Sequence, residues 1–426
     1  MKAVSLFCSS GIGDLGLSSN GIETVVANEL LPDRAMLFQN NNPNCKMFIG
    51  DIWKLKDEIV KYTKDHFKKI DVILATPPCQ GMSSNGMGKM LNDYRKGIRP
   101  KYDERNRLII PTLKIIKEIK SDYVIFENVP NMNNTYILDE NDNLVNIVEY
   151  IFDELKDDYV GSATVVNVAD YGVAQKRQRL ITVLSKTKNG KMYFEKYGTF
   201  IPQPTHSIDG KKGKTKWLTL KDAIGNVPPI DGKKGKNKDI NVSVLHKVPI
   251  VDDKKYFWIE NTPEGDSAFN NQCVNPSCMY QGNKKHGAAL DENGINKSSN
   301  ETPLYCEKCG ALLPRPYVED KDGTKRLMKG YISAYKRMRW DEPASTLTTN
   351  FQYACSDNKI HPSQNRVLSM YEATILQGIS NYNYSFIVNN KLVSDSLIRD
   401  TIGESVPPKV IDVIAQNITE IEKDVN

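Results

Sequence analysis

The chain has no apolar run long enough to cross a membrane among its 426 residues. The apolar run within Met1–Cys8 is also shorter than the hydrophobic segment of a secretory signal. These absences exclude a membrane-spanning protein and predict a cytoplasmic one. Its eight cysteines are therefore expected to be thiols or metal ligands and not disulfides.

The chain also has little net charge, because 57 Lys and Arg against 52 Asp and Glu give only +5. The charge is unevenly distributed, since residues 186–260 contain sixteen lysines, no arginine and eight acidic side chains. Such a basic segment favours an anionic polymer as partner, and solvated loops are the alternative.

The sequence pattern divides the chain into three parts. Strand and helix patterns alternate in residues 1–196, which predicts an α/β domain with three αβα layers and a mostly parallel sheet. The alternation is lost in residues 197–393, where we expect a smaller, irregular, β-rich domain. Residues 394–426 contain a periodic apolar segment, which predicts a helix that returns to the first domain.

One short stretch, Asp71–Gly81, has an unusual composition. Asp71–Ala75 predicts a buried strand, and the two prolines after it hold Cys79 at the carboxyl edge of that strand. Ligands bind at this edge of open α/β sheets, so Cys79 is a candidate nucleophile. A buried apolar thiol is the alternative. The Gly/Ser-rich residues 81–90 indicate a lid loop.

A glycine-rich turn follows the first expected strand. Gly11, Gly13 and Gly16 match GxGxxG, a pattern in which the backbone approaches a nucleotide-like cofactor. The next two strands lead to Glu29, an acceptor for ribose hydroxyls, and to Asp51, an acceptor for an adenine amine. Helix capping is the alternative for both carboxylates, and an NAD-dependent oxidoreductase would use the same turn.

Three charged residues are expected near the Cys79 strand. Glu127 ends a buried strand, which makes it a candidate acid with a raised pKa, or else a cap of the next turn. Arg177 and Arg179 have the same parity on an extended segment, so both are expected to face one site. Arginine forks suit carbonyl and phosphate oxygens.

Two cysteine pairs lie in the irregular part of the chain. Cys273 and Cys278 flank four residues, and Cys306 and Cys309 form a C-x-x-C pair. This spacing predicts a structural Cys₄ zinc site. Two unrelated thiol pairs, or a redox C-x-x-C, are the alternatives. Two near-identical lysine-rich octets, residues 209–216 and 231–238, predict turns that contact phosphates or are solvated tips.

Together and in this order, the motifs resemble the DNA cytosine-C5 methyltransferase family over nearly the whole chain. The resemblance is carried by the glycine turn, Pro77–Gln80, Glu127–Val129, Gln175–Arg179, Arg339–Thr346 and Gly403–Val406. It implies a Rossmann-like, S-adenosylmethionine-dependent fold with a target-recognition domain, as in bacterial restriction–modification enzymes. The Cys₄ pattern is not a general feature of that family.

The resemblance implies methyl transfer from S-adenosylmethionine to C5 of a flipped-out cytosine through a covalent Cys79–C6 adduct, which gives 5-methylcytosine. Glu127 would act at N3, Arg179 at O2, and Arg177 on a backbone phosphate or a loop. The expected cofactor residues are Phe7, Gly11, Gly13, Glu29, Asp51, Ile52, Pro78 and Ser405. The expected DNA contacts are Gln80, Ser83, Lys211, Lys212, Lys233, Lys234 and Arg339.

The expected protein is a monomeric, prokaryotic, nucleoid-associated enzyme that acts on double-stranded DNA, and a restriction endonuclease with the same site is a candidate partner. An RNA (tRNA) cytosine-C5 methyltransferase shares the same motifs. An NAD-dependent oxidoreductase leaves Cys79 and Glu127 without roles, and a catalytically silent relative is disfavoured because no catalytic residue is missing. The chain departs from the family at Ser9, usually glycine, and at Glu404, usually asparagine.

Overall fold

The computed structural model describes residues 1–78, 103–286, 302–328 and 333–423. The residues predicted at Cys79, Gln80 and Ser83, and the lid predicted at 81–90, lie outside these ranges. No helix in the described part of the chain combines the length and the apolar character needed to cross a membrane.

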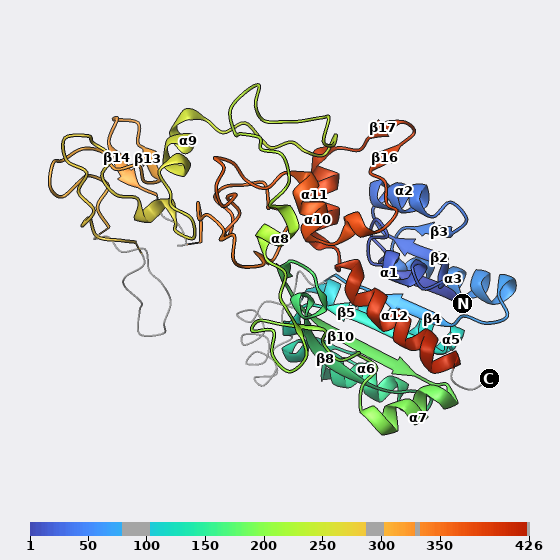
Figure 1. Cartoon of the computed structure of the whole chain (residues 1–426). Helices are drawn as coiled ribbons and strands as arrows, with labels where there is room; N and C mark the ends of the chain where they lie inside the picture. The colour runs from blue at the N-terminus through green and yellow to red at the C-terminus, as the bar shows by residue number, and fades with distance from the viewer. Residues whose placement is uncertain (79–102, 287–301, 329–332, 424–426) are drawn as a thin grey trace.

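A central sheet of seven strands organises the first part of the chain (Figure 1). Its spatial order is β3 (Lys46–Ile49), β2 (Glu23–Glu29), β1 (Lys2–Leu6), β4 (Val72–Ala75), β5 (Tyr123–Asn128), β10 (Gln178–Ser185) and β8 (Val160–Asn167). Strand β10 is antiparallel to both β5 and β8, and the other neighbouring pairs in the sheet are parallel. The strand order reverses between β1 and β4, so a crevice is expected beyond their carboxyl ends.

Helices cover both faces of the sheet, as the predicted three-layer architecture requires. One face carries α3 (Ile52–His66), α5 (Ile109–Ile119) and α6 (Ile147–Leu155), and the other carries α1 (Leu15–Ser18), α7 (Lys188–Tyr197) and α12 (Pro408–Lys423). Helix α2 (Pro32–Asn41) follows β2. Successive strand residues alternate between the faces, so that Val4 lies in one apolar core and Ala3 in the other.

The part of the chain between α7 and α12 is irregular. Its own strand pairs are β11 (His206–Ser207) with β12 (Thr215–Lys216), β13 (Tyr317–Glu319) with β14 (Lys325–Leu327), and β16 (Ile387–Val388) with β17 (Lys391–Leu392). Its β15 (Ala344–Ser345) pairs with β9 (Gln175–Lys176), which precedes α7. Its α-helices are α8 (Leu220–Ile224), α9 (Asp253–Glu260), α10 (Met370–Leu376) and α11 (Asp395–Glu404). In Figure 1, α9, β13 and β14 lie far from the sheet, whereas α10 and α11 lie beside it.

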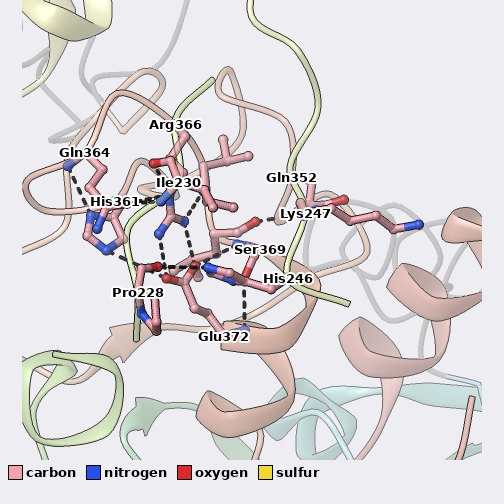
Figure 2. A network of polar contacts seen from close by, with 12 residues as sticks. Pro228, Ile230, His246, Lys247, Gln352, His361, Gln364, Arg366, Ser369 and Glu372 are labelled. Carbon is pink, nitrogen blue, oxygen red and sulfur yellow. Dashed lines mark hydrogen bonds and ion pairs between the residues drawn. The ribbon is translucent and has the colours of Figure 1, made fainter. Parts of the chain in front are cut away.

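A buried ion pair organises the segments that surround α10 (Figure 2). Arg366 donates two hydrogen bonds to the carboxylate of Glu372, each of 2.7 Å, and both side chains are fully buried. Although burial raises the pKa of Glu372, the combined effects of Arg366, His361 and the Ser369 N–H hold that pKa below its usual value. Arg366 also donates to the carbonyl of Ile230, and His246 joins Ser369 to the carbonyl of Pro228. Polar contacts therefore hold together segments that lack a regular sheet.

Close packing of α12 onto α1 depends on Gly16, the third glycine of GxGxxG. A Cβ atom at Gly16 would lie 2.4 Å from the backbone nitrogen of Asp412 and 2.5 Å from the carbonyl oxygen of Pro408. These distances leave no room for a side chain, because both neighbours are helix backbone. Gly16 thus serves helix packing, while Gly11 has a positive φ of 83° and shapes the turn.

We expect Gly16→Ala to lower the free energy of unfolding by about 1–3 kcal/mol, because the added methyl group forces α1 away from α12. Chemical denaturation followed by circular dichroism measures this change. Gly13→Ala is the matched control, since a Cβ at Gly13 would lie 4.0 Å from its nearest neighbour, Leu74. Equal unfolding free energies for the two variants would contradict the packing role.

Candidate functional site

A cavity of about 530 Å³ lies at the carboxyl ends of the central strands, at the reversal of strand order. Its volume is typical of a site for a small molecule or cofactor. Residues predicted from the sequence that line it are Phe7, Gly13, Glu29, Asp51, Ile52, Pro78, Glu127, Arg177, Arg179 and Ser405. The structure therefore brings together residues from both ends of the chain in one cavity.

Glu29 holds the glycine turn in place from the end of β2. Its carboxylate accepts the Ser9 N–H and the Leu31 N–H, each at 2.9 Å. Ser9 has a φ of 48°, a conformation that favours glycine, and the bond to Glu29 helps to stabilise it there. The carboxylate oxygens have further lone pairs, so Glu29 can also accept hydrogen bonds from a ligand in the cavity.

Two aspartates line the same cavity. Asp51 caps α3, because its Oδ1 accepts the Trp53 N–H at 3.0 Å. The two interpretations of Asp51 from the sequence, a site residue and a helix cap, are therefore compatible. Asp14 was not anticipated from the sequence. It accepts hydrogen bonds from Thr24 and Ser5, and burial raises its pKa to about 6. The one sequence feature that could have identified Asp14 is its position within the glycine turn.

Glu127 and Arg179 form an ion pair on adjacent strands. Glu127 lies near the end of β5, and its Oε1 is 2.8 Å from Nε of Arg179, at the start of β10. Burial raises the pKa of Glu127, and this effect outweighs the opposing influence of Arg179 and Arg177. A carboxyl group in this environment holds a proton more readily than a solvated one, as general acid catalysis requires.

Arg177 joins three segments that are far apart in the sequence. It is 1% exposed, and its guanidinium donates to the carbonyl of Leu347 at 2.6 Å and to that of Gly403 at 3.0 Å. Gly403 is itself packed closely, because a Cβ there would lie 2.2 Å from the backbone nitrogen of Thr349. Arg177 and Arg179 thus line one cavity, as their shared parity predicts, but they have different partners.

Asn128 fixes the segment that leads to Cys79. Its side-chain amide donates to the carbonyl of Pro77 at 3.0 Å, and its side-chain oxygen accepts the Val129 N–H at 2.8 Å. The end of β5 is thereby tied to the two prolines that follow β4. The sequence motif contains Asn128, but this contact depends on strand pairing and is not visible from spacing.

Glu404, one of the two departures from the family pattern, forms an ion pair with Arg34 of α2. Both side chains line the cavity. The sequence identified Glu404 only as an unusual residue, and gave no signal for Arg34.

The predicted DNA-contacting side chains that the structure describes lie outside the cavity lining. Lys211, Lys212, Lys233 and Lys234 are exposed on turns. Arg339 is also exposed, and it donates two hydrogen bonds to Asp341, each of 2.9 Å. Their role in DNA binding remains a prediction.

The four cysteines of the predicted metal site converge. Their sulfur atoms all lie within 4.8 Å of one another, with 3.7 Å between Cys273 and Cys309 and 3.9 Å between Cys278 and Cys306. Four thiolates around a tetrahedral zinc, with Zn–S bonds of about 2.3 Å, lie about 3.8 Å apart. The geometry fits zinc, and the separations are too long for disulfide bonds.

Comparison with known proteins gives consistent results. Residues 1–420 match the family model described as C-5 cytosine-specific DNA methylase. The type II methyltransferase M1.HgaI of Avibacterium volantium is 30% identical over 98% of both chains. The type II methyltransferase M1.HphI of Haemophilus parahaemolyticus is 22% identical, over 98% of this chain and 86% of its own.

Solved structures share the fold at lower identity. A methyltransferase of Entamoeba histolytica, EhMeth, superposes with a TM-score of 0.53 at 11% identity, over 99% of both chains. The Dnmt2 methyltransferase of S. pombe superposes with a TM-score of 0.52 at 11% identity, also over 99% of both chains. At these identities the solved structures show only the fold, whereas the matched family is defined by its activity. The chain therefore belongs to the C-5 cytosine-specific DNA methylase family and is a DNA cytosine-5 methyltransferase.

Proposed function

We propose that this enzyme is the modification methyltransferase of a type II restriction–modification system and methylates cytosine within a short sequence of double-stranded DNA. The family match and the type II relatives support this assignment. The observation that carries the chemistry is the buried Glu127–Arg179 pair beside the Pro77–Pro78 segment that leads to Cys79. A restriction endonuclease that recognises the same site is the expected companion.

The cavity fits S-adenosylmethionine, which supplies an electrophilic methyl group on a sulfonium centre. Glu29 has acceptor capacity for ribose hydroxyls, and the Oδ2 atom of Asp51 is not used in capping α3. Phe7 and Ile52 give the cavity an apolar lining for a flat base. These side chains would hold the adenosine part, and residues 403–406 line the same cavity from the other end of the chain.

Cys79 is the proposed nucleophile. Cytosine C5 is a weak nucleophile, so addition of the Cys79 thiolate to C6 is needed to make C5 electron-rich. The base must leave the DNA stack for C6 to be reached. Once C5 carries the methyl group, transfer of the C5 proton to solvent and departure of the Cys79 thiolate would restore the C5–C6 double bond, and return of the N3 proton to Glu127 would leave neutral 5-methylcytosine. The cations of Arg177 and Arg179 favour the thiolate form.

Glu127 is the proposed acid at cytosine N3. Proton donation to N3 withdraws electrons from the ring while the Cys79 sulfur adds, so that negative charge does not accumulate on the base. Arg179 orients the Glu127 carboxyl group through the 2.8 Å contact and would hold the cytosine O2. We assign Arg177 a positioning role through the carbonyls of Leu347 and Gly403.

We further propose that Cys273, Cys278, Cys306 and Cys309 bind one structural zinc ion. Four protein ligands leave no open coordination position, so the ion would stabilise the fold and take no part in methyl transfer. The exposed Lys211, Lys212, Lys233, Lys234 and Arg339 would contact DNA phosphates and position the enzyme.

Cys79→Ser is expected to abolish DNA methylation while binding of S-adenosylmethionine persists, because a hydroxyl group is a much poorer nucleophile than a thiolate. Bisulfite sequencing of mixed-sequence plasmid DNA, after incubation with enzyme and cofactor, measures methylation and gives the target sequence. Resistant cytosines in one short context, absent with Cys79→Ser, support the proposal. If plasmid DNA stays unmethylated while tRNA becomes methylated, the substrate is RNA.

The pH dependence of methylation should show the raised pKa of Glu127. Because the protonated carboxyl group is the acid, kcat/KM should fall as the pH rises through that pKa. Glu127→Gln should lower kcat/KM by about 10²–10⁴-fold and remove this alkaline decline. Glu118→Gln, on the exposed face of α5, is the control. An unchanged decline in Glu127→Gln would exclude Glu127 as the acid.

Purified enzyme should contain about one zinc ion per chain, measured by mass spectrometry of the metal. Cys306→Ser should lose the zinc ion, expose the described residues 271–286 and 302–315 to proteolysis and weaken DNA binding, while S-adenosylmethionine binding persists. Cys355→Ser is the matched control, because Cys355 is an exposed thiol outside the cluster. Equal zinc content in the two variants would contradict the proposed site.

A further inference from the structure

The ion pair between Arg34 and Glu404 connects two walls of the cofactor cavity. Arg34 belongs to α2, which follows the β2 strand that carries Glu29, and Glu404 is the last residue of α11. Their side chains are 16% and 34% exposed, so the pair is partly shielded from water. Both residues line the cavity, together with the Leu30 and Leu31 side chains.

Neither helix gains stability from its own member of the pair. Arg34 is the third residue of α2, where the helix dipole disfavours a cation, and Glu404 is at the carboxyl end of α11, where it disfavours an anion. Asp400 lies one turn before Glu404 and repels it, which contributes to the raised pKa of Asp400 after the larger effect of burial. The favourable partner for each charge is therefore on the other helix.

The two connected walls hold different parts of the cavity. Leu31 is the N-cap residue of α2, and its N–H donates to Glu29, the expected ribose acceptor. Glu404 lies between Gly403, whose carbonyl accepts from Arg177, and Ser405, whose carbonyl accepts from Gln377. A contact between Arg34 and Glu404 thus joins the ribose side of the cavity to the side fixed by Arg177.

We propose that the Arg34–Glu404 ion pair is a clasp that holds these two walls together around S-adenosylmethionine and sets its affinity and its rate of release. The proposal rests on the proposed use of this cavity for that cofactor. Arg34 and Glu404 act here as positioning residues. Separation of the pair would let the cavity wall at Leu31 move away from the wall at Ser405 and would weaken the hold on the cofactor.

Loss of the clasp is not expected to unfold α2. At its other end, Asn41 donates to the carbonyl of Ser385 at 2.9 Å and accepts the Ser385 N–H at 2.8 Å. Asn40 donates to the carbonyl of Ile387. The helix is thus attached to the β16 region independently of Arg34, and variants at the clasp can be compared as folded proteins.

Equilibrium dialysis with radiolabelled S-adenosylmethionine tests the clasp in the full-length protein. Arg34→Gln and Glu404→Gln should each raise the Kd about fivefold, as expected for a partly shielded ion pair. The double variant should be no weaker than either single variant, because both changes remove one interaction. High ionic strength should raise the Kd of the wild type and leave the Kd of the variants that lack the ion pair unchanged.

A charge-swapped protein, Arg34→Glu with Glu404→Arg, separates bridging from direct contact with the cofactor. It should recover wild-type affinity, since the bridge is restored and each charge then lies at the helix end that favours it. Failure to recover affinity would overturn the clasp. Asp395→Asn, which removes the Lys247–Asp395 pair at the other end of α11, is the matched control and should leave the Kd unchanged.

Two further outcomes distinguish failure of the clasp proposal from failure of the proposed function. If wild type and variants bind S-adenosylmethionine with the same Kd, the clasp is wrong and the methyltransferase proposal stands. If the wild type does not bind S-adenosylmethionine, the proposed use of the cavity fails and the clasp fails with it.

Discussion

The cation of Arg177 is the constraint on which the arrangement of the site depends. Its guanidinium is buried and donates to the carbonyls of Leu347 and Gly403, so one side chain joins the start of β10 to segments 170 and 226 residues further along the chain. A buried cation is costly unless its donors are satisfied, so these segments cannot move apart independently. The cavity wall at residues 403–406 is thus fixed relative to the Glu127–Arg179 pair by Arg177.

The glycine turn illustrates how a local conflict is resolved by a distant residue. Ser9 adopts a left-handed conformation that glycine occupies more easily, and the Glu29 carboxylate accepts its N–H. Glu29 therefore has two functions: it stabilises the strained turn and presents acceptor oxygens to the cavity. The position of the turn is then coupled to the same carboxylate that is proposed to bind the ribose.

The sequence predicted the parts of the site that follow from local pattern. Strand ends placed Glu29, Asp51 and Glu127 at one edge of a parallel sheet, and cysteine spacing predicted the Cys₄ cluster. The sequence did not predict contacts made across long separations, such as Asn128 with Pro77 or Arg34 with Glu404, because spacing carries no information about which strands and helices become neighbours. The packing role of Gly16 was missed for the same reason.

The irregular part of the chain was predicted as irregular and β-rich but without the bounds of its elements, because buried arginines replace the periodic patterns that identify elements in a sequence. Arg337 donates to the carbonyls of Ile259, Thr262, His361 and Gln364, and Arg315 to those of Asn271, Lys284 and Pro303. Each guanidinium donates hydrogen bonds to backbone carbonyls that, in a sheet, would accept from the backbone N–H groups of a neighbouring strand. Loops satisfied in this way need no regular strand pairing, so they can present exposed lysines in many directions. Such a surface suits the phosphate contacts proposed for these lysines, because exposed loop residues can be placed without rebuilding a sheet.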